Sequence, residues 1–167
     1  MKKIILLIQV LTFSLMAAGQ TMSVPVSTTL SGTDFGTTIQ LPVNAANVPN
    51  GSLAIIGEID YNPAILTFVG FSNPVDLSAY NVSVFLTNPN PGTIAFSIYD
   101  ETNITPFNVA DGKLFDIDFT FNGGESDIVI SEPQYMDGNS DEFSFTTING
   151  TISGFATITS VSAGGTW

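Results

Sequence analysis

Hydrophobic and polar residues alternate along most of the chain after residue 20, with the two-residue period of β-strands. The clearest segment is KLFDIDFTF, residues 113–121. One of its faces carries Phe115, Ile117, Phe119 and Phe121, and the other carries Leu114, Asp116, Asp118 and Thr120. A shift of one residue would place two aspartates in the core, so this pattern fixes the register strongly.

Further segments show the same alternation and are separated by clusters of Gly, Pro and Asn. They are TIQLPVN (38–44), IIGEID (55–60), TIAFSIYD (93–100), DIVISEP (127–133) and TTINGTIS (146–153). Pro42 restricts the first of them to an edge or a bulged strand, because proline cannot donate to the ladder. No amphipathic helix of ten or more residues is evident. About nine short strands predict an all-β fold, a two-sheet antiparallel sandwich with the phenylalanines between its sheets.

The stretch DYNPAILTFVGF, residues 60–71, interrupts this pattern with a turn-forming pair, Asn62 and Pro63. Asn62 can start the turn through its side chain, and proline presets the backbone angle. Leu66 and Phe68 then return to the core as the next strand. We interpret the stretch as a corner of the sandwich and not as a binding or catalytic loop.

The two ends of the chain are predicted to lie outside the folded domain. Residues 1–19 combine two lysines, an apolar run and Ala17-Ala18-Gly19, which is the pattern of a secretory signal peptide. The apolar run is short for a membrane span, which needs about 20 residues, and a retained anchor is the alternative. The domain is predicted over residues 22–154. Residues 155–167 are interpreted as a linker or the start of a missing downstream region.

Charge and composition narrow the classes of function. After residue 19 the chain carries all 15 acidic residues and only Lys113 as a cation, a net charge of about −14, with no Arg, His or Cys. Such a surface cannot neutralise phosphates, which argues against nucleic acid as a partner. The same charge disfavours anionic membranes, and no membrane insertion is expected after signal cleavage. A chain without His or Cys cannot build a Ser-His-Asp triad, a thiol nucleophile or an ordinary zinc site.

Carboxylates and tyrosines are the remaining candidates for chemistry. The pairs Glu58/Asp60 and Asp116/Asp118 have a glycosidase-like spacing of about 6.6 Å along a strand, but they lie on polar faces, so no enzyme activity is expected. Asp137, Asn139 and Asp141 match the first ligand positions of an EF-hand loop, but the later positions fail, and we expect at most a weak structural calcium site. No other cofactor is expected. The exposed aromatic strip that a carbohydrate-binding module needs could come only from Tyr61, Tyr80, Tyr99 and Tyr135.

Several segments in order resemble the landmarks of cohesin domains. LPVNAANVPNGSLAIIGEIDYNPAILTFVGF (41–71) is similar to the first half of the family, with Tyr61-Asn62-Pro63 where cohesins have Tyr-Asp-Pro. GTIAFSIYDE (92–101), ADGKLFDIDFTF (110–121) and DGNSDEFSFTTINGTISG (137–154) resemble later landmarks. The resemblance implies a nine-stranded jelly roll and a non-catalytic receptor for dockerin modules in polysaccharide-degrading assemblies.

In the family, the dockerin lies on a sheet built from the third, fifth, sixth and eighth strands. Transferred by motif position, these strands are residues 53–60, 82–87, 93–99 and 127–134. Strand parity then points six residues toward the partner: Ile56, Glu58, Ala95, Ser97, Tyr99 and Val129. An acidic receptor would suit a partner helix that bears Lys or Arg.

The prediction is therefore a secreted or cell-surface cohesin-like recognition module, bacterial in the style of its signal, that binds a dockerin-like protein. A carbohydrate-binding or adhesive module, with polysaccharide as a second ligand, is the first alternative. A structural spacer in a larger surface protein is the second.

Overall fold

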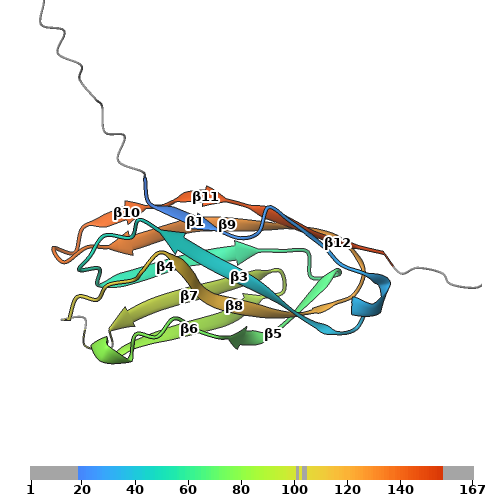
Figure 1. Ribbon diagram of the computed structural model, residues 1–167, viewed down its shortest axis with the longest axis horizontal. Helices are drawn as coiled ribbons and strands as arrows, with labels where there is room; N and C mark the ends of the chain where they lie inside the picture. Colours follow the sequence, from blue (N-terminus) through green and yellow to red (C-terminus); the bar gives the residue numbers. More distant parts are fainter. Residues whose placement is uncertain (1–18, 101, 103–104, 156–167) are drawn as a thin grey trace, which may run out of the picture.

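The computed structural model describes residues 19–100, 102 and 105–155 as a sandwich of two β-sheets (Figure 1). Residues 1–18 of the predicted signal peptide and residues 156–167 of the predicted C-terminal segment lie outside the described residues, so both stay predictions. The first sheet has the strand order β11-β1-β3-β8-β5. The second has the order β2-β12-β9-β4-β7-β6, and β10 also pairs with β9.

Twelve strands and two short 3-10 helices make up the described part of the chain. The strands are β1 Thr21–Ser23, β2 Ser27–Thr29, β3 Thr38–Ala46, β4 Ala54–Asp60, β5 Leu66–Ser72, β6 Val82–Asn90, β7 Thr93–Asp100, β8 Gly112–Phe121, β9 Gly124–Met136, β10 Glu142–Ser144, β11 Thr146–Ile148 and β12 Gly150–Gly154. The 3-10 helices are η1 Gly32–Asp34 and η2 Ser78–Tyr80. The predicted all-β sandwich is confirmed.

The count of twelve reduces to the predicted nine when interrupted strands are merged. β1 and β2 are one extended segment that leaves the first sheet and joins the second, and β10, β11 and β12 switch between the sheets in the same way. The N-terminal segment crosses over β12 at Gly150, where a Cβ atom would lie 1.9 Å from the carbonyl oxygen of Pro25. Only glycine allows this close approach. Consequently β1 pairs with β11, and β2 with β12, in parallel, whereas the other pairings are antiparallel.

The inner faces of both sheets supply one continuous core. Phe115, Ile117, Phe119 and Phe121 are all buried, as their alternation in β8 predicts. From the second sheet, Ile55 and Ile59 of β4 and Ile94, Phe96 and Ile98 of β7 fill the other side. Each such side chain contributes about 1.5–3 kcal/mol by leaving water.

Pro42 lies in β3, which is an inner strand of its sheet and not an edge. The pairing of β3 with β8 shifts register between Val43 and Asn44, but the extra residue, Leu114, lies in β8, so β3 itself is not the bulged strand. β1 pairs with β3 only at residues 44–46, so β3 has no second described neighbour at Pro42. The missing N–H group of the proline therefore leaves no ladder partner unsatisfied on that side.

The stretch from Asp60 to Phe71 is a corner between β4 and β5, as predicted. The side chain of Asn62 accepts a hydrogen bond from the backbone N–H of Ala64 at 3.0 Å, which is the turn-starting bond expected of Asn or Asp. Tyr61 is buried against Phe119, with ring centroids 4.9 Å apart. Its backbone N–H also donates to the carbonyl oxygen of Gly92 at 2.8 Å, so the corner holds the β6–β7 hairpin in place.

Candidate functional site

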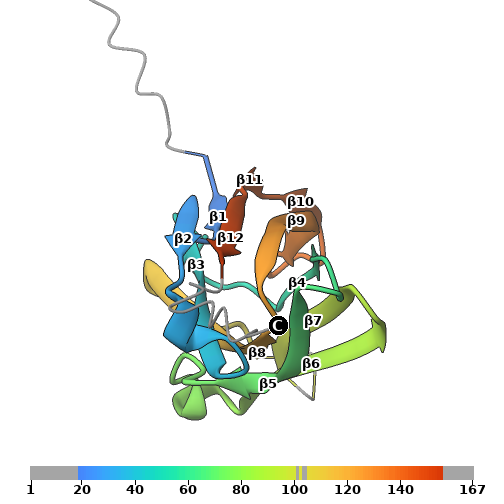
Figure 2. The same cartoon turned by 90° about the vertical axis from the view of Figure 1, so that its right-hand side faces the viewer.

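The four strands predicted to form a binding surface are neighbours in one sheet, in the order β9-β4-β7-β6. Viewed from the end of the sandwich, they form one wall of the molecule, with β3 and β8 in the opposite layer (Figure 2). Across this wall Ile56 pairs with Ser97 and Gln134, and Glu58 pairs with Ala95 and Ser131. The prediction of which strands meet is therefore confirmed, including the poorly patterned strand β6.

The six residues predicted to point outward all lie on the outer face of this sheet. Ile56 and Val129 are 42% and 38% exposed, and Glu58 is exposed as well. Ala95, Ser97 and Tyr99 follow one another on β7 and are half-buried by their neighbours. We call the outer surface of β9, β4, β7 and β6 the candidate face.

Phe85 on β6 adds an aromatic group to the candidate face that the sequence reasoning missed. It pairs across the strands with Ser97, is 40% exposed, and stacks on Tyr99 with centroids 5.3 Å apart and an interplanar angle of 27°. Stacked aromatic pairs contribute about 0.5–1.5 kcal/mol beyond the area they bury. Together with Ile56, Phe85 and Tyr99 give the candidate face an apolar side over β4, β7 and β6. Parity in VSVFLT, residues 82–87, was the signal that could have identified Phe85.

The other side of the candidate face is acidic. The carboxylate of Asp60, at the end of β4, accepts hydrogen bonds from the hydroxyl groups of Thr93 on β7 and Ser131 on β9. One strand on each side of β4 thus holds this carboxylate in the plane of the candidate face. Glu58 and Glu132 line a shallow depression at the centre, together with Ile56.

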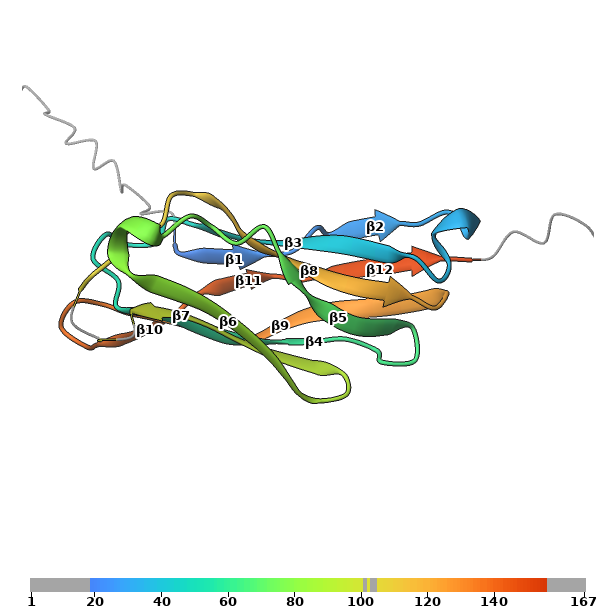
Figure 3. The same ribbon diagram turned by 90° about the horizontal axis from the view of Figure 1, so that it is seen from below.

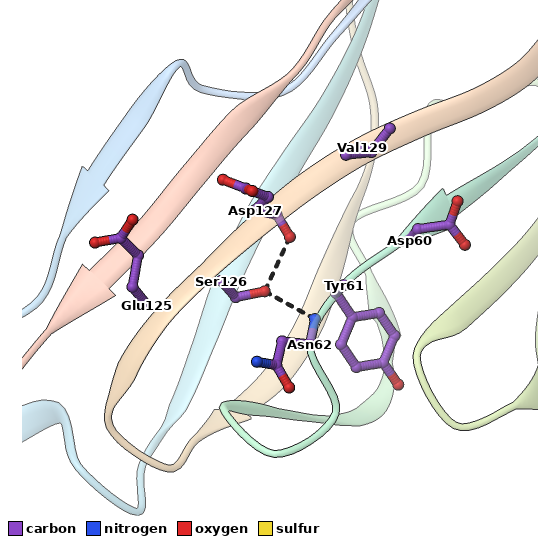
Figure 4. A pocket seen from close by; sticks show the side chains of 7 residues that line it. All are labelled: Asp60, Tyr61, Asn62, Glu125, Ser126, Asp127 and Val129. Atoms are coloured by element: carbon purple, nitrogen blue, oxygen red, sulfur yellow. Dashed lines mark hydrogen bonds between the residues drawn. The ribbon is translucent and has the colours of Figure 1, made fainter.

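A second depression lies beside Asp60, where β9 begins and the β4–β5 corner starts (Figure 4). The side chains of Glu125 and Asp127 line it from β9, with Val129 between Asp127 and Asp60. The hydroxyl group of Ser126 is hydrogen-bonded within the protein. It accepts a bond from the backbone N–H of Asn62 and donates one to the backbone carbonyl of Asp127, both at 2.9 Å. This contact fixes the corner to β9.

The loop 137–142, predicted as a weak calcium site, has its own internal bonding. One carboxylate oxygen of Asp137 accepts the backbone N–H groups of Asn139 and Asp141, at 2.8 and 3.0 Å. The other accepts the side-chain amide of Asn139 at 3.2 Å. The backbone bond from Asp141 leads the effects that hold the pKa of Asp137 below its usual range. No group of three carboxylates among the described residues is placed to hold a metal ion, and the calcium site stays a prediction without support from the geometry.

The aromatic strip needed for carbohydrate binding does not form from the tyrosines. Tyr61 and Tyr135 are buried in the core, at 8% and 5% exposure. Tyr80 is half-buried as the last residue of η2, and of the four tyrosines only Tyr99 lies on the candidate face. The hydroxyl oxygen of Tyr61 accepts a hydrogen bond from the side-chain amide of Asn88 at 2.8 Å. A buried tyrosine with a bonded hydroxyl in this way is a packing residue.

The Asp116 and Asp118 pair lies on the outer face of the opposite sheet. Asp116 accepts from Lys113 Nζ and from Asn73 Nδ2, both at 2.7 Å, and Asp118 accepts from Ser72 at 2.9 Å and Gln40 at 3.2 Å. Burial of Asp116 opposes its ionisation, but the bonds from Lys113 and Asn73 outweigh it, so its pKa lies below the usual range. A general acid needs a raised pKa, so Asp116 is not suited to that role, and the hydrogen bonds of both aspartates form a structural network.

No helix in the described part of the chain is long and apolar enough to cross a membrane.

Cohesins are among the solved structures with the same fold. A solution structure of a cohesin from Clostridium acetobutylicum is 24% identical, with a TM-score of 0.62, and the match covers 82% of this chain and 92% of that one. A crystal structure of the sixth cohesin of scaffoldin B from Acetivibrio cellulolyticus, in complex with a dockerin, is 16% identical with a TM-score of 0.68, covering 81% and 98%. A non-cellulosomal cohesin from the archaeon Archaeoglobus fulgidus is 19% identical with a TM-score of 0.61, covering 82% and 91%.

A search of curated proteins gives no match. The family model for the cohesin domain matches residues 22–153, which is most of the chain and the whole of the sandwich. The resemblance noted in the sequence is therefore confirmed, and the chain belongs to the cohesin domain family.

Proposed function

We propose that this protein is a non-catalytic receptor that binds a dockerin-type module through the candidate face. The observation that carries the proposal is the arrangement of β9, β4, β7 and β6 in one sheet, with an apolar group of side chains next to a row of carboxylates on its outer surface. Protein interfaces combine an apolar centre with a polar rim in this way. Family membership and the cohesin–dockerin complexes among the similar structures support the choice of partner.

The chemistry of the candidate face indicates what the partner surface carries. Phe85, Tyr99 and Ile56 favour an apolar or aromatic patch on one side of the partner. Glu58, Asp60 and the other carboxylates favour Lys or Arg on the other side, since opposite charges raise the association rate and fix the orientation. The net charge of the chain strengthens the attraction of any basic partner.

The setting of this receptor is an extracellular or cell-surface assembly that holds enzymes acting on polysaccharides. The predicted signal peptide is compatible with secretion. The core is well filled and the chain has no cysteine, so the fold does not depend on disulfide bonds. Attachment to such an assembly would come through the partner.

The test is a binding measurement with the dockerin-type modules encoded by the same genome, by calorimetry in calcium-containing buffer. We expect binding by the wild type and a loss of affinity of about tenfold or more in Tyr99→Ala and Phe85→Ala, because central aromatic residues carry much of the binding energy. Val69→Ala is the matched control, since Val69 is 58% exposed on β5 of the opposite sheet. Equal affinity in all four proteins would remove the candidate face from the interaction. Binding to soluble glycans instead of any dockerin would overturn the proposal.

A further inference from the structure

The pairing of β9 with β4 contains a bulge at the centre of the candidate face. β9 runs beside β4 along the sheet (Figure 3), and the register shifts between Ile56 and Glu58. Two residues of β9, Glu132 and Pro133, therefore lie opposite the single residue Gly57 of β4. Proline is tolerated inside a sheet at such a place, because the bulge interrupts the ladder. Bulges also re-aim side chains, and they are frequent next to functional sites.

Glu132 adopts a backbone conformation that its residue type disfavours. Its φ is 47°, in the left-handed region, where residues other than glycine and asparagine are strained by their Cβ atom. It also precedes a proline, and that position favours an extended backbone. Among the described residues, the other non-glycine positions with a positive φ are three asparagines and one serine: Asn47, Asn73, Asn81 and Ser140. A long charged side chain here is kept at a cost in stability, and strain of this kind is concentrated at functional sites.

The side chain of Glu132 is exposed and lines the shallow depression in the middle of the candidate face. We call this the central depression, and it is lined mainly by Ile56, Glu58, Ala95, Glu132 and Gln134. Ile56 and Ala95 give it an apolar part, and Gln134 adds an amide to the two carboxylates. No described residue donates a hydrogen bond to either carboxylate or forms an ion pair with it. Both carboxylates are therefore available to a partner.

The chain has no cation of its own for the central depression. Lys113 is the only lysine or arginine among the described residues, and its Nζ atom lies 2.7 Å from the carboxylate of Asp116 on the opposite sheet. Two like charges at one depression repel each other, and a cation beside both replaces this repulsion by attraction. A metal ion is disfavoured, since no group of three Asp or Glu side chains in the described part of the chain is placed to hold one. The cation has to come from the partner.

We infer that Glu132 is a specificity-determining residue, whose carboxylate receives an arginine side chain of the partner in the central depression. This inference rests on the proposed function, because the partner is the dockerin-type module that binds the candidate face. Arginine fits the lining better than lysine, since its planar guanidinium group presents several N–H donors and its aliphatic stem can lie on Ile56. The bulge holds the Glu132 backbone in one conformation, so less entropy is lost on binding.

The test compares two substitutions of Glu132 by calorimetry with the dockerin-type modules encoded by the same genome. Glu132→Gln removes the charge and keeps the length, whereas Glu132→Asn removes the charge and introduces a residue that tolerates a left-handed backbone. Both should bind about tenfold or more weakly, because a charge-assisted hydrogen bond to arginine is lost. Only Glu132→Asn should unfold at a higher urea concentration than the wild type, because the strain is relieved. A purely structural residue would not lose affinity while stability rises.

Asp111→Asn is the matched control for the change in net charge. Asp111 lies just before β8 of the opposite sheet, and asparagine keeps the oxygen that accepts the backbone N–H of Asn47 at 2.7 Å. This variant should bind like the wild type. If Glu132→Gln also bound like the wild type while Tyr99→Ala lost affinity, the inference would be overturned and the proposed function would stand. If no module bound the wild type, both would be overturned.

A double-mutant cycle identifies the residue of the partner. Each arginine and lysine of the bound module is replaced by alanine in turn, and each variant is titrated with the wild type and with Glu132→Gln. One arginine should be coupled to Glu132, so that its replacement costs about tenfold less affinity when Glu132 is already substituted. Coupling to no basic residue, or to a lysine alone, would overturn the inference.

Discussion

The substitution Gly57→Ala should destabilise the sandwich although alanine is a better strand residue than glycine. Gly57 lies in β4 under the candidate face, at the register shift in the β4–β9 ladder, and pairs with Phe96 of β7. A Cβ atom on Gly57 would lie 2.7 and 2.9 Å from two atoms of the Phe96 ring and 3.2 Å from the Cα atom of Pro133. Phe96 is buried and packs on Phe115, with centroids 5.4 Å apart, so its ring cannot easily move away.

The expected cost follows from two opposing effects. Overpacking a filled core by one methyl group costs about 1–3 kcal/mol. Replacing glycine lowers the conformational entropy of the unfolded chain, which raises the free energy of unfolding by about 0.4–1 kcal/mol. The clash dominates, and the free energy of unfolding should fall by about 1–2 kcal/mol.

Urea unfolding followed by circular dichroism measures this change, and a shift of the midpoint at constant slope would identify it as a change of stability. Gly70→Ala in β5 is the matched control, because a Cβ atom there meets nothing within 4 Å. The control should be neutral or slightly stabilised. A double-mutant cycle with Phe96→Leu assigns the clash: Gly57→Ala should cost less when the ring is absent. If Gly57→Ala and Gly70→Ala had the same effect, the argument from the Phe96 contact would be refuted.

Three further substitutions have outcomes fixed by single contacts. Lys113→Met should lower the free energy of unfolding near neutral pH, because it removes a bond to the buried Asp116. The pKa of Asp116 is depressed in the folded state, so its contribution to stability is present above the unfolded pKa near 3.9 and is lost as the pH falls below it. Urea unfolding at several pH values should therefore show a difference from wild type that vanishes in acid. Asp100→Asn should loosen the segment after β7, since the carboxylate accepts bonds from Thr102 and Thr105 N–H groups at 2.9 and 2.8 Å, and hydrogen exchange of these amides should become faster. Pro63→Ala should lower the melting temperature and leave partner affinity unchanged; the opposite result, an unchanged melting temperature with lost binding, would contradict the corner interpretation.

Alternation in the sequence predicted the sheets well wherever one face is buried. In β8 and β4 every residue predicted to face inward is buried, but Leu114 and Asp116, predicted on the other face of β8, are buried as well. The landmark segments then placed β4, β7 and β9 in one sheet. The first inference needed only the local pattern, whereas the second came from the resemblance to cohesin domains and the order of its motifs.

The alternation of the sequence did not predict contacts between residues that are far apart in the chain. The break between β1 and β2 depends on the approach of Pro25 to Gly150, and these residues are far apart in the chain. Phe85 was missed although parity places it outward, because both faces of VSVFLT carry apolar residues and its inward residues are only half-buried in the structure. The acidic side of the candidate face was also hidden, since Asp60 comes from β4 whereas Glu125 and Asp127 come from β9.

The position of the β4–β5 corner links the fold to the proposed interaction. Tyr61 is held by Gly92 and Asn88 of the β6–β7 hairpin, and the next residue, Asn62, is held by Ser126 of β9. One corner thus ties together the two outermost strands of the candidate face, while Asp60, directly before it, is bonded to both neighbouring strands. A partner that needs a flat surface of fixed charge spacing benefits from this bracing, because preorganised groups lose less entropy on binding. Tyr61 and Asn62 would therefore support the proposed recognition through the geometry of the sheet, without a contact of their own.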